Sequence, residues 1–187
     1  MLFRSKSWKQ LPLERILQSG ITVVRGQGQK PAAELTDRLD GWFVKALRED
    51  PDSLVLTLLQ SELRELQGRS GEVESIYRGL LARKDLTPIQ TAIVSNNLAY
   101  SLARPETSAE AKKLIDAAIL ELGPQPDLLD TRGVVLIAAG ENRRAIEALE
   151  EAILVPSPTR YMHLAAAQLA DKQTAAARRS LDEAKKI

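Results

Sequence analysis

The sequence predicts an all-α fold in which antiparallel helix pairs stack one on the next. Apolar residues recur at helical spacing along most of the 187-residue chain. Prolines stand ahead of four such segments, at intervals of 37, 38 and 32 residues. Aromatic residues make up only 4% of the chain while Ala and Leu dominate, a composition that favours close helix packing over a β-sandwich.

The first part of the chain, residues 1–31, is a basic segment whose structure the sequence leaves open. Residues 1–30 contain six basic side chains and one acidic side chain, a net charge of +5, so that the remaining chain is near −4. The stretch LPLERILQSG has the pattern of a helix, whereas ITVVRGQGQK suits a loop or a short strand. Residues 32–49 form a helix, with one apolar face made of Leu35, Leu39, Trp42, Phe43, Ala46 and Leu47.

The rest of the chain divides into four helix pairs, over residues 51–87, 88–124, 126–156 and 158–187. Each pair follows a proline, which suits the first turn of a helix because its missing N–H would have no partner there. The four prolines are Pro51, Pro88, Pro126 and Pro158.

Further residues mark where the helices begin and end. Thr87 with Gln90, and Thr107 with Glu110, have the spacing of capping boxes, in which two side chains bond the first backbone N–H groups of a helix. Ser157 supplies an N-cap hydroxyl. Glycines end helices or mark the turns between them at Gly68, Gly123 and Gly140.

The third pair has large and small residues in a fixed order. Leu129, Arg132, Gly133 and Leu136 give large, large, small and large positions on the first helix, and Ala145, Leu149 and Ala152 give small, large and small on the second. This pattern resembles the tetratricopeptide repeat (TPR), a helix-turn-helix unit of about 34 residues. Small residues at these positions let two helix backbones approach closely. The second and fourth pairs repeat the pattern, and the first is looser.

The resemblance implies a right-handed α-α superhelix over residues 32–187, whose first helices line a concave groove for a peptide or helix of a partner protein. Asparagine amides there could bond a peptide backbone, and Tyr100 offers an amphipathic surface. The alternative is a solvated inner face on which the asparagines bond neighbouring helix ends. The candidate groove residues are Asn96, Asn97, Tyr100, Asp127, Asp130, Thr131, Val134, Met162, His163 and Ala166.

One TPR subtype clamps a C-terminal carboxylate with lysine, arginine and asparagine side chains. Asn97 fits the middle asparagine of that clamp, but the third unit offers Asp127 and Thr131 where the clamp needs cations. Because an acidic residue repels a carboxylate, binding of chaperone tails is not expected.

No motif for catalysis, a metal or a cofactor is present. The chain has no cysteine, and His163 is its only histidine, which excludes the usual zinc sites. Gly26 and Gly28 follow an apolar run, but Pro31 stands where the phosphate-binding fingerprint needs a third glycine. We therefore expect no cofactor and no enzymatic activity.

The near-zero net charge and the short apolar runs indicate which kinds of partner are not expected. A net charge of +1 is too small to attract nucleic acid or a charged membrane surface over a distance, so we expect neither as a partner. No apolar run reaches the roughly 20 residues that a membrane span needs. We expect a cytoplasmic protein–protein interaction scaffold. The alternatives are a structural or self-associating end of a longer repeat protein, with homo-oligomers formed through terminal repeats, and the regulatory arm of an enzyme.

Overall fold

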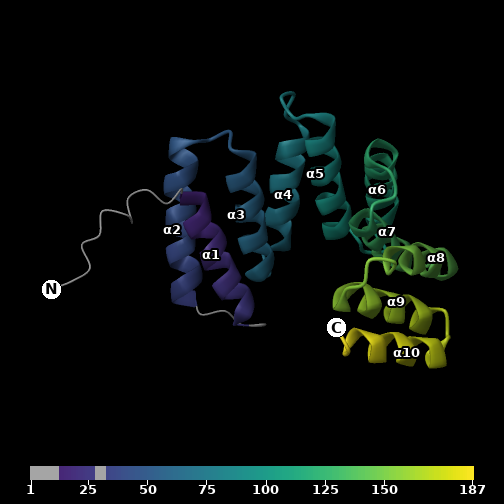
Figure 1. Cartoon of the computed structure of the whole chain (residues 1–187). Coiled ribbons are helices and arrows are strands. Elements are labelled where there is room, and N and C mark those ends of the chain that lie inside the picture. Colours follow the sequence, from purple (N-terminus) through teal and green to yellow (C-terminus); the bar gives the residue numbers. More distant parts are fainter. Residues whose placement is uncertain (1–12, 28–32) are drawn as a thin grey trace. The chain divides into compact units, whose positions relative to one another are not determined.

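The computed structural model describes residues 13–27 and 33–187, which contain ten α-helices and no strand. The all-α prediction is confirmed, and the eight helices expected after residue 50 are present as α3–α10 (Figure 1). Residues 1–12 and 28–32, with Gly28 and Pro31 of the rejected phosphate motif, lie outside the described residues. The helices are α1 (Leu13–Gly26), α2 (Ala33–Glu49), α3 (Leu54–Leu66), α4 (Ser70–Leu81), α5 (Pro88–Ser101), α6 (Ser108–Leu122), α7 (Pro126–Ala138), α8 (Asn142–Ala152), α9 (Pro158–Ala170) and α10 (Thr174–Ala184).

Proline opens three of the four expected first helices. Pro88, Pro126 and Pro158 are the first residues of α5, α7 and α9. Pro51 instead lies in a turn, and α3 begins three residues later, where the Ser53 hydroxyl accepts a hydrogen bond from the backbone N–H of Leu56. A serine N-cap therefore starts this helix, and the prediction for Pro51 is wrong.

The basic N-terminal part contains a helix longer than LPLERILQSG. Helix α1 runs on through Ile21–Gly26, so the prediction of a loop or strand is wrong for these residues. Leu17, Ile21 and Val24 are buried on one side of α1, at the spacing of successive helical turns.

The described residues as far as Ile76 form one compact unit. Within it α1, α2 and α3 pack on one another around a core that includes Leu39, Phe43 and Leu63, all fully buried. Gly20 lies where α1 meets α2, since a Cβ there would approach Leu39 Cδ2 to 2.4 Å.

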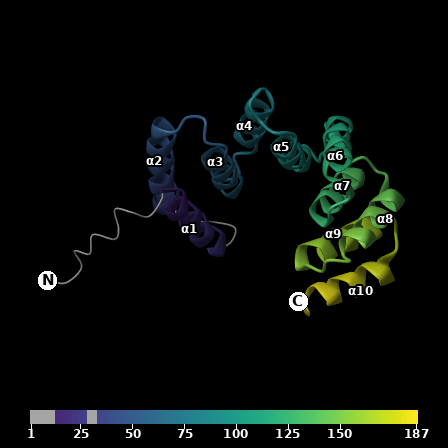
Figure 2. The same ribbon diagram turned by 45° about the horizontal axis from the view of Figure 1, so that its top comes forward.

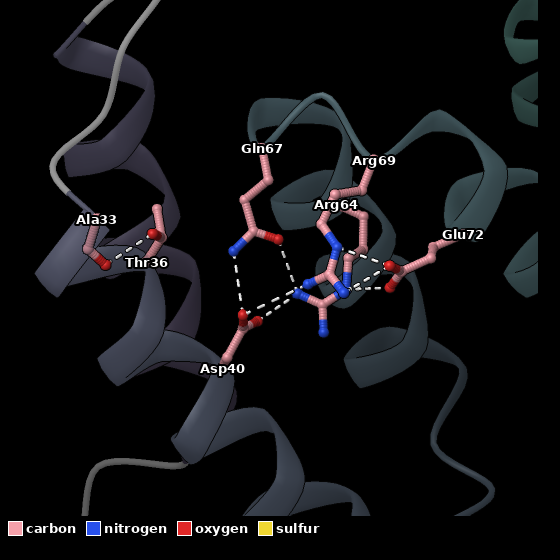
Figure 3. Close-up of polar contacts among 7 residues, drawn as sticks. All are labelled: Ala33, Thr36, Asp40, Arg64, Gln67, Arg69 and Glu72. Atoms are coloured by element: carbon pink, nitrogen blue, oxygen red, sulfur yellow. Dashed lines mark hydrogen bonds and ion pairs between the residues drawn. The ribbon is translucent and has the colours of Figure 1, made fainter.

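A polar cluster, which we call the Arg64 network, joins α2, α3 and the start of α4 in this unit (Figure 3). The Arg64 guanidinium donates to Asp40 and, at 2.8 Å, to Gln67 Oε1, and its Nε lies 3.0 Å from Glu72 Oε2. Arg69 adds a second cation, 2.5 Å from Glu72 Oε1. Since the Arg64 side chain is only 11% exposed, its positive charge depends on these carboxylates in place of water.

Residues Tyr77–Ile187 form the second compact unit. Here α5 packs on α6, α7 on α8 and α9 on α10, and α6 and α8 also contact the following helix. Both views show α9 and α10 side by side (Figure 2). Gly123 and Gly140 adopt positive φ angles of 76° and 74° at the ends of α6 and α7, as glycine does readily.

Among the described residues, no helix combines the length and the apolarity that crossing a membrane requires.

Candidate partner-binding face on α5, α7 and α9

The first helices of the three hairpins in the second unit lie next to one another. Helix α5 contacts α7, and α7 contacts α9. One side of each helix is buried: Leu98 on α5, Leu136 on α7 and Leu164 on α9 are all in the core. The side that remains accessible carries most of the predicted candidate residues, and we call it the α5–α7–α9 face.

At the centre of this face three side chains from three helices meet. His163 Nδ1 lies 2.9 Å and 3.0 Å from the two carboxylate oxygens of Asp130. The rings of Tyr100 and His163 are 6.2 Å apart between centroids and tilted by 47°. The structure therefore brings together Tyr100, Asp130 and His163, all three of which are predicted groove residues.

The contact with Asp130 fixes which nitrogen of His163 carries the proton. A carboxylate oxygen only accepts hydrogen bonds, so Nδ1 is the donor, and Nε2 of a neutral ring is left as an acceptor. The face thus offers a ring nitrogen that can accept a donor from a ligand.

A second acidic residue stands one helical turn away on α7. Asp127 is 85% exposed and pairs with Arg160 of α9. Arg160 is held on its other side, where Nη1 donates to the backbone oxygen of Val155 at 2.5 Å. The negative charge of Asp127 is therefore matched within the face.

The two asparagines contact each other and not neighbouring helix ends. Asn96 Nδ2 donates to Asn97 Oδ1 at 3.3 Å. Asn96 Oδ1 is buried without a hydrogen-bond partner, a situation that costs free energy unless a donor reaches it.

Two other predicted residues differ in accessibility. Met162 is exposed, as a binding residue requires, but Thr131 is only 4% exposed. A residue next to Asp130 on a helix is turned by about 100°, which carries Thr131 into the packed side of α7. Thr131 therefore cannot contact a partner, and its prediction as a groove residue is corrected.

Sequence reasoning missed Arg160 and the exposed apolar residues Ile93 and Leu169. Ile93 stands three residues before Asn96, and Leu169 seven residues after Met162, so extending the same helical spacing would have identified both. No pattern in the sequence indicated the pairing of Arg160 with Asp127, which lie 33 residues apart.

Within residues 13–27 and 33–187, no group of three or more His, Cys, Asp or Glu side chains is arranged to hold a metal ion.

The chain resembles several solved structures, including the following three. TTC0263, a thermophilic TPR protein in Thermus thermophilus, matches with a TM-score of 0.73 and 18% identity, over 92% of this chain and 90% of that one. PilW, a type IV pilus biogenesis factor, has a TM-score of 0.71 and 19% identity, over 94% and 78% of the two chains. PilF of Pseudomonas aeruginosa has a TM-score of 0.63 and 19% identity, over 93% of this chain and 77% of that one. No protein-family model and no curated protein matches the sequence.

The chain has the tetratricopeptide-repeat fold. The predicted class, an all-α TPR-like solenoid of helix hairpins, is thereby confirmed. At identities below one fifth, these likenesses establish the TPR fold and carry no partner from one protein to another. On this fold α5, α7 and α9 are the first helices of successive TPR hairpins.

Proposed function

We propose that the chain is a non-enzymatic scaffold that binds a segment of a partner protein on its α5–α7–α9 face. The observation that carries the proposal is the meeting of Tyr100, Asp130 and His163 from three successive hairpins. They place an aromatic ring, a carboxylate and a ring-nitrogen acceptor together on an accessible side. TPR folds bind their partners through first helices, which supports using this face.

The surroundings of His163 favour binding over catalysis. A histidine held by an aspartate also occurs in nucleophilic enzymes, where its other nitrogen activates a hydroxyl or thiol. The chain has no cysteine, and among the described residues no serine or threonine hydroxyl contacts the His163 ring. Tyr100 meets the ring through a tilted aromatic contact, which suits a recognition surface.

Affinity capture with the full chain as bait tests this proposal. Met162→Arg places a bulky charge at an exposed position of the face, so proteins captured by the wild type through the face should be lost. Leu120→Arg is the matched control, since Leu120 is exposed on α6, away from the face. Equal recovery of the same proteins by both variants and the wild type would contradict the proposal.

A second candidate function is self-association through α10. Leu181 on α10 is 43% exposed, whereas Leu149, at the corresponding position of α8, is fully buried in a core cluster that includes Leu164 and Ala167 of α9. Two copies of the chain could cover Leu181 in the same way. Sedimentation of the wild type and of Leu181→Lys tests this function: a dimer that dissociates only in the variant supports it, and a wild-type monomer at every concentration rules it out.

A further inference from the structure

The α5–α7–α9 face carries very little charge, and nearly all of it is compensated. Helix α5 contains no charged residue, and Arg160 is the only permanently charged residue of α9. On α7, Asp127 is paired with Arg160, and Arg132 Nε lies 3.4 Å from Asp116 of α6. Asp130 remains, with the ring of His163 as its only described partner.

Two rows of exposed apolar side chains lie on either side of Asp130. On α5, Ile89, Ile93 and Tyr100 recur at helical spacing and are exposed. On α9, Met162 and Leu169 form the second row, seven residues apart. Since α7 lies between and contacts both helices, Asp130 is flanked by an apolar row from each side.

Asp127 has an arginine partner, whereas Asp130 has no arginine or lysine partner among the described residues. We infer that the α5–α7–α9 face takes a partner segment in which one basic side chain, arginine in preference to lysine, stands among apolar residues. The inference rests on the proposed function and adds the chemistry of the partner. The basic side chain pairs with Asp130 while its apolar neighbours cover the two rows.

Arginine fits the centre of the face better than lysine. Its planar guanidinium has several N–H donors, two of which can pair with the two Asp130 oxygens, while an ammonium is a single point charge. Tyr100 is exposed next to this pair, and an arginine over a tyrosine ring gains a cation–π attraction. Asp130 and Tyr100 thus favour the same side chain.

Panning a random phage-displayed peptide library against the full chain tests the inference. The selected peptides should be enriched in arginine next to apolar residues, and added salt should weaken their binding. Asp130→Asn should reduce the affinity of a selected peptide by about tenfold. Asp182→Asn, which removes the same charge from the exposed side of α10, should leave it unchanged. Tyr100→Ala gives a second reading that removes the aromatic ring and keeps the Asp130 carboxylate.

The possible outcomes separate the inference from the proposed function. Selected peptides that bind Met162→Arg less tightly than the wild type support the proposed function. If such peptides contain no basic residue, or bind Asp130→Asn and Tyr100→Ala as tightly as the wild type, the inference is overturned and the proposed function stands. If panning selects no peptide, or only peptides that bind Met162→Arg equally well, both are overturned.

Discussion

Gly133 sets how closely α7 and α8 approach. A Cβ at this position would lie 2.3 Å from Leu149 Cγ and 2.8 Å or less from both of its methyl carbons. Leu149 is fully buried in a core cluster, so it can make room only by shifting against its core neighbours. The hydrogen of glycine leaves the room that the leucine fills, as the small–large pattern of the third pair predicted.

We predict that Gly133→Ala destabilises the second unit. Overpacking a core costs about 1–3 kcal/mol, which exceeds the gain of about 0.5–1 kcal/mol from replacing glycine by alanine within a helix. The matched control is Gly41→Ala on α2, where an added Cβ meets nothing within 4 Å and only the gain applies. Thermal unfolding followed by circular dichroism should therefore move in opposite directions for the two variants. A stabilised Gly133→Ala would show that the helix contact is looser than the structure has it.

Helix caps illustrate what could be predicted residue by residue. Both halves of the capping box at Thr87 and Gln90 are present, and Ser157 accepts from the backbone N–H of Arg160. Thr107 has the same local sequence pattern, but its hydroxyl donates to the backbone oxygen of Leu102 at 2.6 Å. The prediction of a capping box at Thr107 is therefore wrong, because the preceding turn of the chain competes for the hydroxyl.

At the scale of the element, the Arg64 network ties three helices of the first unit. Replacing Arg64 by Met would leave the carboxylates of Asp40 and Glu72 facing each other with Arg69 as their remaining cation, 3.8 Å from Asp40. Carboxylates that lose a charged hydrogen-bond partner in a half-buried site cost about 1–3 kcal/mol.

We predict that Arg64→Met lowers the free energy of unfolding by about 1–3 kcal/mol. Arg25→Met is the control in the same unit, because Arg25 pairs with Glu62 across α1 and α3 but is 64% exposed. A surface pair contributes at most about 1 kcal/mol. Urea unfolding of both variants gives the comparison, and an Arg64→Met variant no less stable than Arg25→Met would mean that the network does not hold the helices together.

Helix α1 shows why some elements could not be predicted. Its second half, ITVVRG, is rich in β-branched residues, which favour strands when they are taken alone. Helix α1 packs on α2 and α3, and burying Ile21 and Val24 there outweighs the local preference. This partner surface belongs to distant residues, so a local pattern does not indicate it.

At the scale of the whole molecule, the candidate face was predictable in outline and not in its contacts. Helical spacing placed Tyr100, Asp130 and His163 on one side of their helices, because spacing follows from the sequence alone. The pairing of Asp130 with His163 spans 33 residues and depends on how two hairpins pack. Which charges are compensated, and so what chemistry the face prefers, therefore required the structure.

Acid should weaken the second unit in particular. The Arg78 guanidinium, which donates to both oxygens of Glu110 at 2.6 Å and 2.9 Å, lowers the pKa of that carboxyl. Hydrogen bonds from Arg83 and from Lys112 likewise lower the pKa of Asp85 and of Glu141. A carboxyl whose pKa is lower in the folded chain stabilises it above the unfolded pKa, and this contribution is lost as the pH falls through the folded pKa.

Glu110→Gln measures this effect at one position, where Glu110 in the first turn of α6 joins it to Arg78 of α4. At neutral pH the variant should be less stable than the wild type by less than about 1 kcal/mol, since the pair is largely exposed. The difference in stability between variant and wild type should shrink with added salt. It should vanish well below the ordinary glutamate pKa of 4.5, where the protonated Glu110 of the wild type is as uncharged as the glutamine of the variant. Glu121→Gln on the same helix, which breaks no ion pair among the described residues, should change little at any pH. Thermal unfolding of the variant and the wild type across the acid range tests this prediction. A stability difference that stays constant with pH would show that Glu110 acts by packing and not by its charge.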